Sequence, residues 1–270
     1  MYENYRDLLI ERRGSILYVT LNNPPLNPMT LRMHNELGTI FSDINRDTQT
    51  RVVVLTGAGK AFSAGGNIKD MRDKMDDVAY HLEFMAGGPK IVYGLIDCEK
   101  PIICRMNGHA MGLGASIALL CDIVIASDRA KIADPHVRMG LSAGDGGSLI
   151  WPQLIGFARA KEFLLLGDVI EAKRAAEIGL INHAVPLDQL DAKVDEIAQR
   201  LAKGAYKAIS HTKKSINLQL RQHATALVEA HFKLELETIF SPEHREAVLA
   251  FLEEREPDFI KATASAELEA

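Results

Sequence analysis

The stretch from residue 102 to residue 122, IICRMNGHAMGLGASIALLCD, constrains the fold more than any other part of the chain. It starts as a short apolar strand, turns at Asn107-Gly108, crosses Gly112-Leu113-Gly114 and enters a helix of small residues at Ala115. A strand that breaks on glycines before a buried helix aims unpaired backbone N–H groups outward at the helix N-terminus. Such a terminus can bind an anion, or an oxygen that becomes one during a reaction.

A second glycine-rich break lies upstream, at Ser63-Ala64-Gly65-Gly66-Asn67, and it also follows an apolar strand, Val52 to Thr56. We expect the two breaks to face each other. One backbone N–H from each would then form an oxyanion hole, which stabilises negative charge as it develops on a bound oxygen.

Strands and helices alternate over the first two-thirds of the chain, which predicts an α/β fold. The expected strands are 8–13, 16–21, 52–56, 101–106, 123–126, 131–134 and a strand-like segment from 180, and residues 22–28 form a rigid loop. The expected helices are 30–47, which Thr30 can cap, 69–77, 78–96 with an interruption at Gly87-Gly88-Pro89, one from 148, 158–166 and 172–178. After Pro186 only helices are expected, at 187–203, 205–220, 224–240 and 242–254. The change at Pro186 predicts a core of residues 1–186 and a helical C-terminal region of residues 187–270.

The composition is that of a soluble globular protein, with 47% apolar and 25% charged residues. A net charge of −5 gives no support to a nucleic-acid partner. No segment approaches the roughly 20 apolar residues of a membrane span, and the charged N-terminus has no apolar core typical of a secretory signal. The three cysteines, Cys98, Cys104 and Cys121, lie in apolar runs without CxxC spacing, so we expect reduced thiols and a cytoplasmic protein.

Common cofactor and metal motifs do not fit the chain. The segment GAGKAF lacks the third glycine of a dinucleotide fingerprint, because Phe62 stands there, and no Ser or Thr follows Lys60 as a P-loop requires. The sequence contains no HExxH, no GxSxG and no metal-type cluster of Cys and His, so no bound metal is expected.

Four blocks together resemble the crotonase (enoyl-CoA hydratase/isomerase) superfamily. They are AFSAGGNIKDM from residue 61, NGHAMGLGASIALLCDIVIAS from residue 107, ADPHVRMGL with AGDGG from residue 133, and LLLGDVIEAKRAAEIGLINHAVP from residue 164. The order and spacing of the blocks carry the resemblance, which extends from about residue 8 to about residue 255.

The resemblance implies a spiral of ββα repeats followed by a helical C-terminal region used for trimerisation. It implies a homotrimer, or a hexamer built as a dimer of trimers. The implied substrate is an acyl-CoA thioester, with coenzyme A entering only as part of that substrate and no separate cofactor. The implied oxyanion hole consists of the backbone N–H groups of Gly66 and Leu113.

The resemblance also implies contacts to coenzyme A. Lys60 and Lys69 match positions of basic groups near the nucleotide phosphates, although each also fits a solvated surface lysine. Ala64 and Ile68 match backbone positions that meet the adenine. Phe251 matches an aromatic residue that can reach a neighbouring subunit's adenine.

The chain departs from the family pattern at the acid/base positions. Hydratases of the family use two glutamates, but Ser116 and His136 stand at these positions here. Ser116 fits a small helix residue beneath the oxyanion turn. His136 can act as an acid or base near neutral pH, or it can be a structural histidine. Asp145, between glycines in AGDGG, can be a catalytic acid, base or water-orienting group, or a helix N-cap.

These observations leave several functions open. The first is enoyl-CoA hydratase-type reversible hydration of a 2-enoyl-CoA through an enolate, with Asp145 and His136 in place of the glutamates. The second keeps the oxyanion hole for isomerisation, decarboxylation, or C–C or thioester hydrolysis. The third is an acyl-CoA-binding protein without turnover.

Overall fold

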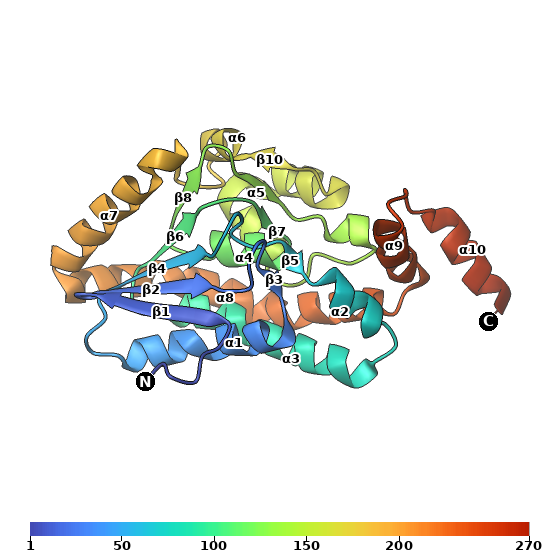
Figure 1. Cartoon of the computed structure of the whole chain (residues 1–270), viewed down its shortest axis with the longest axis horizontal. Coiled ribbons are helices and arrows are strands. Elements are labelled where there is room, and N and C mark those ends of the chain that lie inside the picture. The colour runs from blue at the N-terminus through green and yellow to red at the C-terminus, as the bar shows by residue number, and fades with distance from the viewer. Residues whose placement is uncertain (270) are drawn as a thin grey trace.

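The computed structural model describes residues 1–269 and shows a mixed α/β architecture (Figure 1). The main sheet has six strands in the order β1-β2-β4-β6-β8-β11. β1 pairs antiparallel with β2, and the remaining strands pair in parallel. Every residue of β4 is buried, as its β-branched run predicts. The strands of this sheet are β1 (Leu8–Arg13), β2 (Ile16–Leu21), β4 (Val52–Gly57), β6 (Ile102–Met106), β8 (Ile123–Ser127) and β11 (His183–Val185).

Most central strands are followed by a shorter strand and then by a helix. β2 leads to β3 and α1, β4 leads to β5 and α2, and β6 leads to β7 and α4. The short strands form two further sheets, with the orders β3-β5 and β10-β9-β7. This repeat confirms the expected crotonase-like spiral of ββα units. Its elements are β3 (Pro28–Met29), β5 (Gly65–Gly66), β7 (Ala110–Met111), β9 (Lys131–Ala133), β10 (Ile170–Glu171), α1 (Leu31–Arg46), α2 (Ile68–Asp73) and α4 (Leu113–Leu119).

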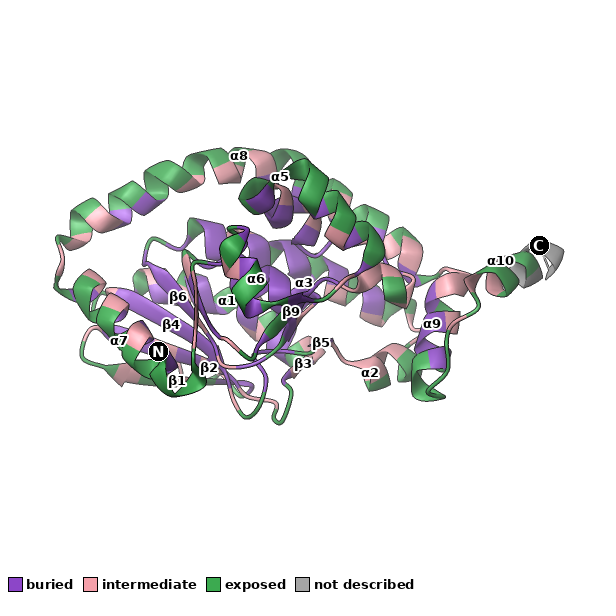
Figure 2. Cartoon of the chain, turned by 90° about the horizontal axis from the view of Figure 1, so that it is seen from above, coloured by how far each residue is buried: buried purple, intermediate pink, exposed green. Residues whose placement is uncertain are grey.

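Helices cover both faces of the main sheet. α7 (Leu187–Lys203) lies against one face, where Leu190 and Val194 join a buried cluster with Val54 and Ile103 of the sheet. On the other face α1 packs against α3 (Val78–Asp97), and α8 (Tyr206–Ile239) packs on α3. Figure 2 shows the central strands β4 and β6 as buried, inside the helices that surround the sheet. Burying one large aliphatic side chain contributes about 1.5–3 kcal/mol, so these two interfaces stabilise much of the fold.

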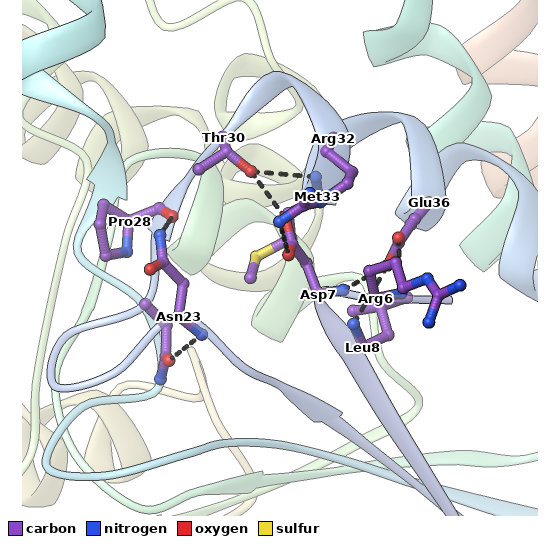
Figure 3. A network of polar contacts seen from close by, with 10 residues as sticks. Arg6, Asp7, Leu8, Asn23, Pro28, Thr30, Arg32, Met33 and Glu36 are labelled. Atoms are coloured by element: carbon purple, nitrogen blue, oxygen red, sulfur yellow. Dashed lines mark hydrogen bonds and ion pairs between the residues drawn. The ribbon is translucent and has the colours of Figure 1, made fainter. Parts of the chain in front are cut away.

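The start of α1 is fixed to the N-terminal segment by polar contacts (Figure 3). Thr30 caps the helix as expected, because its hydroxyl accepts a hydrogen bond of 3.1 Å from the backbone N–H of Met33. The same hydroxyl donates to the buried carboxylate of Asp7 over 2.9 Å. Glu36 accepts hydrogen bonds from the backbone N–H groups of Arg6 and Asp7 at 2.7 and 2.9 Å. This network fixes the position of the segment before β1 relative to the first turns of α1.

Two expected helix breaks are wrong. α3 continues through Gly87-Gly88-Pro89, where the glycines give space for close neighbours. A Cβ placed on Gly88 would lie 2.0 Å from Cε1 of Phe232 in α8, so a side chain there would push the two helices apart. α8 is one helix of 34 residues and shows no break between residues 220 and 224. That segment contains no Gly or Pro, so nothing in it interrupts helical hydrogen bonding.

Other boundaries also differ from expectation. The two-residue strands are too short to show an alternating pattern, and β3 occupies the end of the segment expected as a loop. α2 ends at Asp73 instead of residue 77. The helices expected from 148 and at 158–166 form α5 (Gly147–Leu166), which leaves helical geometry at Gly156, with φ 79° and ψ 159°. α6 is Ala172–Glu177.

The C-terminal region contains only helices after β11 among the described residues, namely α7, α8, α9 (Pro242–Leu252) and α10 (Phe259–Glu269). α10 was not expected, and it extends away from the sheet at one end of the molecule (Figures 1 and 2). None of the helices described is both long enough and apolar enough to span a bilayer. The boundary at residue 186 and the trimer stay predictions.

Candidate active site

A cavity of about 540 Å³ opens where the two glycine breaks meet. Its wall includes the stretch from Ala64 to Lys69, together with Gly112 and His136. Phe251 of α9 and Leu141 close other sides of the cavity. The structure thus brings Ala64, Gly66, Ile68, Lys69, His136 and Phe251, which the sequence singled out, to one cavity.

The two glycine breaks face each other, as the sequence predicts. The backbone N–H of Met111 donates to the carbonyl of Ser63 over 3.0 Å. Gly65 has a positive φ of 79°, and a Cβ on it would lie 2.6 Å from the carbonyl oxygen of Met111. Only glycine fits this approach without moving backbone atoms. The breaks are therefore joined closely enough to contribute to one binding surface.

The expected oxyanion donors lie at this junction. Leu113 is the first residue of α4, so its N–H has no partner within the helix. Gly112 precedes it with φ 52° and provides no side-chain cap. Gly66 and Gly112 both line the cavity. The assignment of Gly66 and Leu113 as a donor pair stays a prediction, which this placement supports.

His136 lies next to the second break and between two carboxylates. It begins a short 3₁₀ helix, η1 (His136–Met139), directly after β9. Its Nδ1 contacts the carboxylate of Asp134, and its Nε2 lies 3.2 Å from Oδ2 of Asp145. A Cβ placed on Gly112 would lie 3.4 Å from Cε1 of the ring. The imidazole is thus fixed in orientation beside the predicted position of the reacting carbonyl.

Ser116 and Asp145 are in direct contact. Ser116 is fully buried in α4, and its hydroxyl donates to Oδ1 of Asp145 over 2.9 Å. Asp145 is buried at the turn before α5, where Gly146 occupies the N-cap position. The carboxylate faces Ser116 and His136, and it also accepts a hydrogen bond from the backbone of Gly147. Ser116 is therefore a small packed residue, as its sequence context indicates, and it also positions Asp145.

Glu235 completes the cluster and was missed by the sequence interpretation. It comes from α8, is 4% exposed, and its Oε1 lies 3.8 Å from Nε2 of His136. Its Oε2 has no hydrogen-bond partner among the described residues. The signal available in the sequence was a glutamate in the buried stripe formed by Val228, Phe232 and Ile239 of the same helix.

The electrostatics of the cluster follow from burial and mutual contact. Burial alone would lower the pKa of His136, but the carboxylates of Asp134 and Asp145 raise this pKa well above its ordinary value. Burial would raise the pKa of Asp145, but the charge and hydrogen bond of His136 lower it. Burial, followed by repulsion from Asp145, raises the pKa of Glu235 well above its ordinary range. These shifts favour the protonated forms of His136 and Glu235 and the ionised form of Asp145.

Asp134, His136 and Asp145 also offer three potential metal-ligand atoms within 4.8 Å of one another. Both ring nitrogens of His136 already face carboxylate oxygens, however. The geometry is therefore that of a hydrogen-bonded chain of acids and bases.

Lys60, Lys69 and Phe251, expected at coenzyme A, and Asn67 and His109 of the glycine-rich segments lie as follows. Lys69 is exposed at the cavity wall, whereas Lys60 is exposed outside the residues that line it. Phe251 is 59% exposed and reaches the cavity of its own chain. Asn67 caps α2 by accepting a hydrogen bond of 3.1 Å from the backbone N–H of Lys69. Nδ1 of His109 accepts a hydrogen bond from the backbone of residue 131 over 3.1 Å, which indicates a structural role.

The chain is similar to known proteins over almost its full length. The family model described as enoyl-CoA hydratase/isomerase matches residues 11–262. A short-chain-enoyl-CoA hydratase of Clostridium acetobutylicum is 31% identical over 257 residues, which cover 94% of this chain and 98% of the relative. The structure of an enoyl-CoA hydratase/isomerase from Mycobacterium paratuberculosis superposes with a TM-score of 0.87 and 34% identity, covering 90% of this chain and 97% of that one. A β-diketone hydrolase from the cyanobacterium Anabaena, bound to (S)-3-oxocyclohexyl acetic acid, gives a TM-score of 0.82 and 29% identity over 88% of this chain and 96% of that one.

Proposed function

Because this chain belongs to the enoyl-CoA hydratase/isomerase family, we propose that it acts on an acyl-CoA thioester through an enolate held in an oxyanion hole. The first candidate reaction is the reversible hydration of a 2-enoyl-CoA. The observation that carries this proposal is the convergence at one cavity of Gly66, of Gly112 at the start of α4, and of His136, whose ring is paired with the buried carboxylate of Asp145.

The groups of the cluster can supply the proton transfers that hydration requires. The N–H groups of Gly66 and Leu113 polarise the thioester carbonyl, and each such donor can contribute about 3 kcal/mol or more to lowering the barrier. Asp145 takes a proton from water while the oxygen of that water bonds to C3 of the substrate. The enolate then collapses as C2 takes a proton from His136 or Glu235, whose raised pKa values favour their protonated forms. A proton returned from Asp145 restores the starting state.

A second candidate is hydrolysis of a carbon–carbon bond between two carbonyl groups. Two observations favour it: the glutamate pair of the hydratases is absent at Ser116 and His136, and a structural neighbour is a β-diketone hydrolase. In this reaction water attacks one carbonyl, the bond to the central carbon breaks, and the leaving enolate takes a proton. The same base and acids suffice for it. The buried ionised cluster argues against a role restricted to binding, because keeping charges out of water is costly.

The test is a direct comparison of substrates. Crotonyl-CoA is incubated with the protein, and the loss of the conjugated enoyl thioester absorbance is followed; 2-enoyl-CoAs of other chain lengths and a set of cyclic β-diketones are assayed in parallel. Hydration is supported by turnover of the thioesters. Turnover of diketones alone supports the second candidate, and tight binding of thioesters without any turnover leaves only the binding role.

The contacts to coenzyme A and the assembly state belong to the same proposal. Lys69 would meet the phosphates, with Ala64 and Ile68 near the adenine and Phe251 beside it. Exposed apolar side chains on α5, Phe157 at 69% and Leu165 at 70%, support burial in an interface. We therefore propose a homotrimer or a dimer of trimers, which light scattering on the purified protein distinguishes from a monomer. The cytoplasmic location stays a prediction.

A further inference from the structure

A second, smaller cavity of about 50 Å³ lies beyond Gly66, and we call it the distal pocket. It shares Gly66, Asn67, Met71 and Leu141 with the main cavity, so a substrate whose carbonyl lies at Gly66 would extend its far end into it. The volume admits only a few water-sized groups, which limits the acyl chain to a short one.

The distal pocket is not uniformly apolar. Met29, Phe84, Met85 and Ile239 form apolar walls, but His81, Glu235 and His244 also line it. A pocket that bound only a hydrocarbon chain would gain nothing from two imidazoles, and each buried polar group without a partner costs about 1–3 kcal/mol. These polar groups therefore require an explanation.

His81 provides the sharpest evidence. It lies on α3, is 6% exposed, and its Nε2 has no hydrogen-bond partner among the described residues. Its ring is held edge-on to Phe240, with centroids 5.4 Å apart. The backbone at Lys74 and Met75 acts to raise the pKa of the ring, as acceptors facing a ring nitrogen do, although burial has the larger effect and lowers it. Because Nε2 is unpartnered, we assign the ring hydrogen to Nδ1.

This tautomer leaves Nε2 of His81 as an acceptor. His244 repeats the arrangement, because its Nδ1 contacts the carbonyl oxygen of Met139 over 2.7 Å and must be the donor. Burial lowers the pKa of both histidines, so both rings are neutral at pH 7. Nε2 of His81 is therefore a buried acceptor in the lining of the distal pocket that no described residue satisfies.

We propose that the distal pocket binds a hydroxyl group at the far end of a short acyl chain, with Nε2 of His81 accepting its hydrogen bond. The substrates would be short hydroxyacyl-CoA thioesters that carry the hydroxyl at the end remote from the thioester. This inference rests on the proposed acyl-thioester function and specifies its substrate class. His81 is on this view a specificity-determining residue, and proton transfer remains with the His136 cluster.

The test measures binding and needs no turnover. Isothermal titration calorimetry compares 4-hydroxybutyryl-CoA with butyryl-CoA, and 5-hydroxypentanoyl-CoA with pentanoyl-CoA. In at least one pair we expect the hydroxy ester to bind about tenfold more tightly or better, since its hydroxyl satisfies a buried acceptor. His81→Phe, which keeps the aromatic contact with Phe240, should abolish this preference. His81→Gln, which retains an acceptor, should keep part of it. Leu82→Ala, at an exposed position on the same helix, is the control and should behave as the wild type.

The outcomes separate the two proposals. If each hydroxy ester binds no better than its apolar partner, the distal subsite is wrong although the acyl-thioester function stands. A preference that survives in folded His81→Phe overturns the role of His81. If no thioester binds at all, the proposed function fails and this inference fails with it. Should His81→Phe not fold, the ¹⁵N chemical shift of Nε2 in the wild type takes its place: 4-hydroxybutyryl-CoA or 5-hydroxypentanoyl-CoA must move it and the apolar esters must not.

Discussion

Asp145→Asn is the substitution that tests the catalytic cluster most directly. It removes one negative charge at nearly constant side-chain volume. An amide oxygen can still accept the hydrogen bond that Ser116 donates over 2.9 Å, so the packing around α4 is kept. What changes is the environment of His136, whose Nε2 loses a carboxylate at 3.2 Å. The proton-accepting oxygen is lost at the same time.

The magnitude follows from these contacts. An opposite charge at this range shifts a pKa by about 1–3 units, so the pKa of His136 should fall by that amount while Asp134 still holds it up. A positioned acid or base contributes about 10²–10⁴-fold to a rate, so kcat on crotonyl-CoA should fall by a factor in that range. KM should change less, because Asp145 does not line the main cavity.

Stability gives a second readout with a definite sign. His136 has a raised pKa. Its contribution to stability is therefore complete at pH values below the ordinary pKa of 6.5, and it is lost as the pH rises through the raised pKa. Asp145 has a lowered pKa, so its contribution is present above its ordinary value of 3.8 and is lost as the pH falls through the lowered value. The Tm difference between wild type and Asp145→Asn should therefore be largest at pH values between the ordinary pKa values of 3.8 and 6.5, and it should become smaller at alkaline pH.

The assay combines kcat and KM at several pH values with thermal unfolding over the same range. Asp168→Asn is the matched control, because Asp168 is half exposed in an ion pair of 2.7 Å with Arg138 and neither residue lines the cavity. The control should keep wild-type kinetics, and its Tm should stay close to that of the wild type. Unchanged kcat and an unchanged pH profile in Asp145→Asn would refute the assignment of Asp145 as the base.

Four further results are expected. Glu235→Gln should lower kcat if Glu235 donates a proton. It should also raise the Tm relative to the wild type as the pH rises above 4.5, the ordinary pKa of glutamate, because a carboxyl group with a raised pKa destabilises the fold once it would ionise in the unfolded chain; a Tm series over pH measures this. Ser116→Ala removes the hydroxyl that holds Asp145, which is worth about 1 kcal/mol, so kcat should fall several-fold and a return to wild-type rate in Ser116→Thr would support positioning. Gly66→Pro deletes a backbone N–H and should abolish turnover, with circular dichroism confirming that the sheet is intact. Lys69→Gln should raise KM for crotonyl-CoA but not for crotonyl-pantetheine, which lacks the nucleotide; equal effects on both would contradict a phosphate contact.

The sequence was most informative where a local pattern decides the structure. The glycine breaks at 63–67 and 112–114 predicted that these two segments pack against each other, because glycine is required where backbones come within contact distance. Thr30 was identified as a helix cap from its residue type and position. The continuous apolar run of residues 52–56 predicted a strand buried on both faces. In each case neighbours in the chain determine the conformation.

Prediction from sequence failed where distant residues decide. Gly87-Gly88-Pro89 has the composition of a helix break, yet the glycines serve the close approach of Phe232, a residue more than a hundred positions away. Glu235 could not be assigned to the cluster because its place depends on how α8 crosses α3, and this crossing has no local signal. The sequence could not predict that His81 is buried with an unpartnered Nε2, because its surroundings also come from distant parts of the chain.

The charges of the cluster indicate which step limits the reaction. Two carboxyl groups, Asp134 and Asp145, face the single imidazole of His136, so acidic groups outnumber basic ones in the buried cluster. A negative site favours proton uptake, and transfer of a proton from water to Asp145 is therefore assisted by its surroundings. The same field opposes the negative charge that develops on the carbonyl oxygen. The backbone N–H groups of Gly66 and Leu113 must offset this opposition, so we infer that enolate formation limits the rate. Losing one of these N–H groups should therefore lower kcat more than losing the proton donor His136 or Glu235.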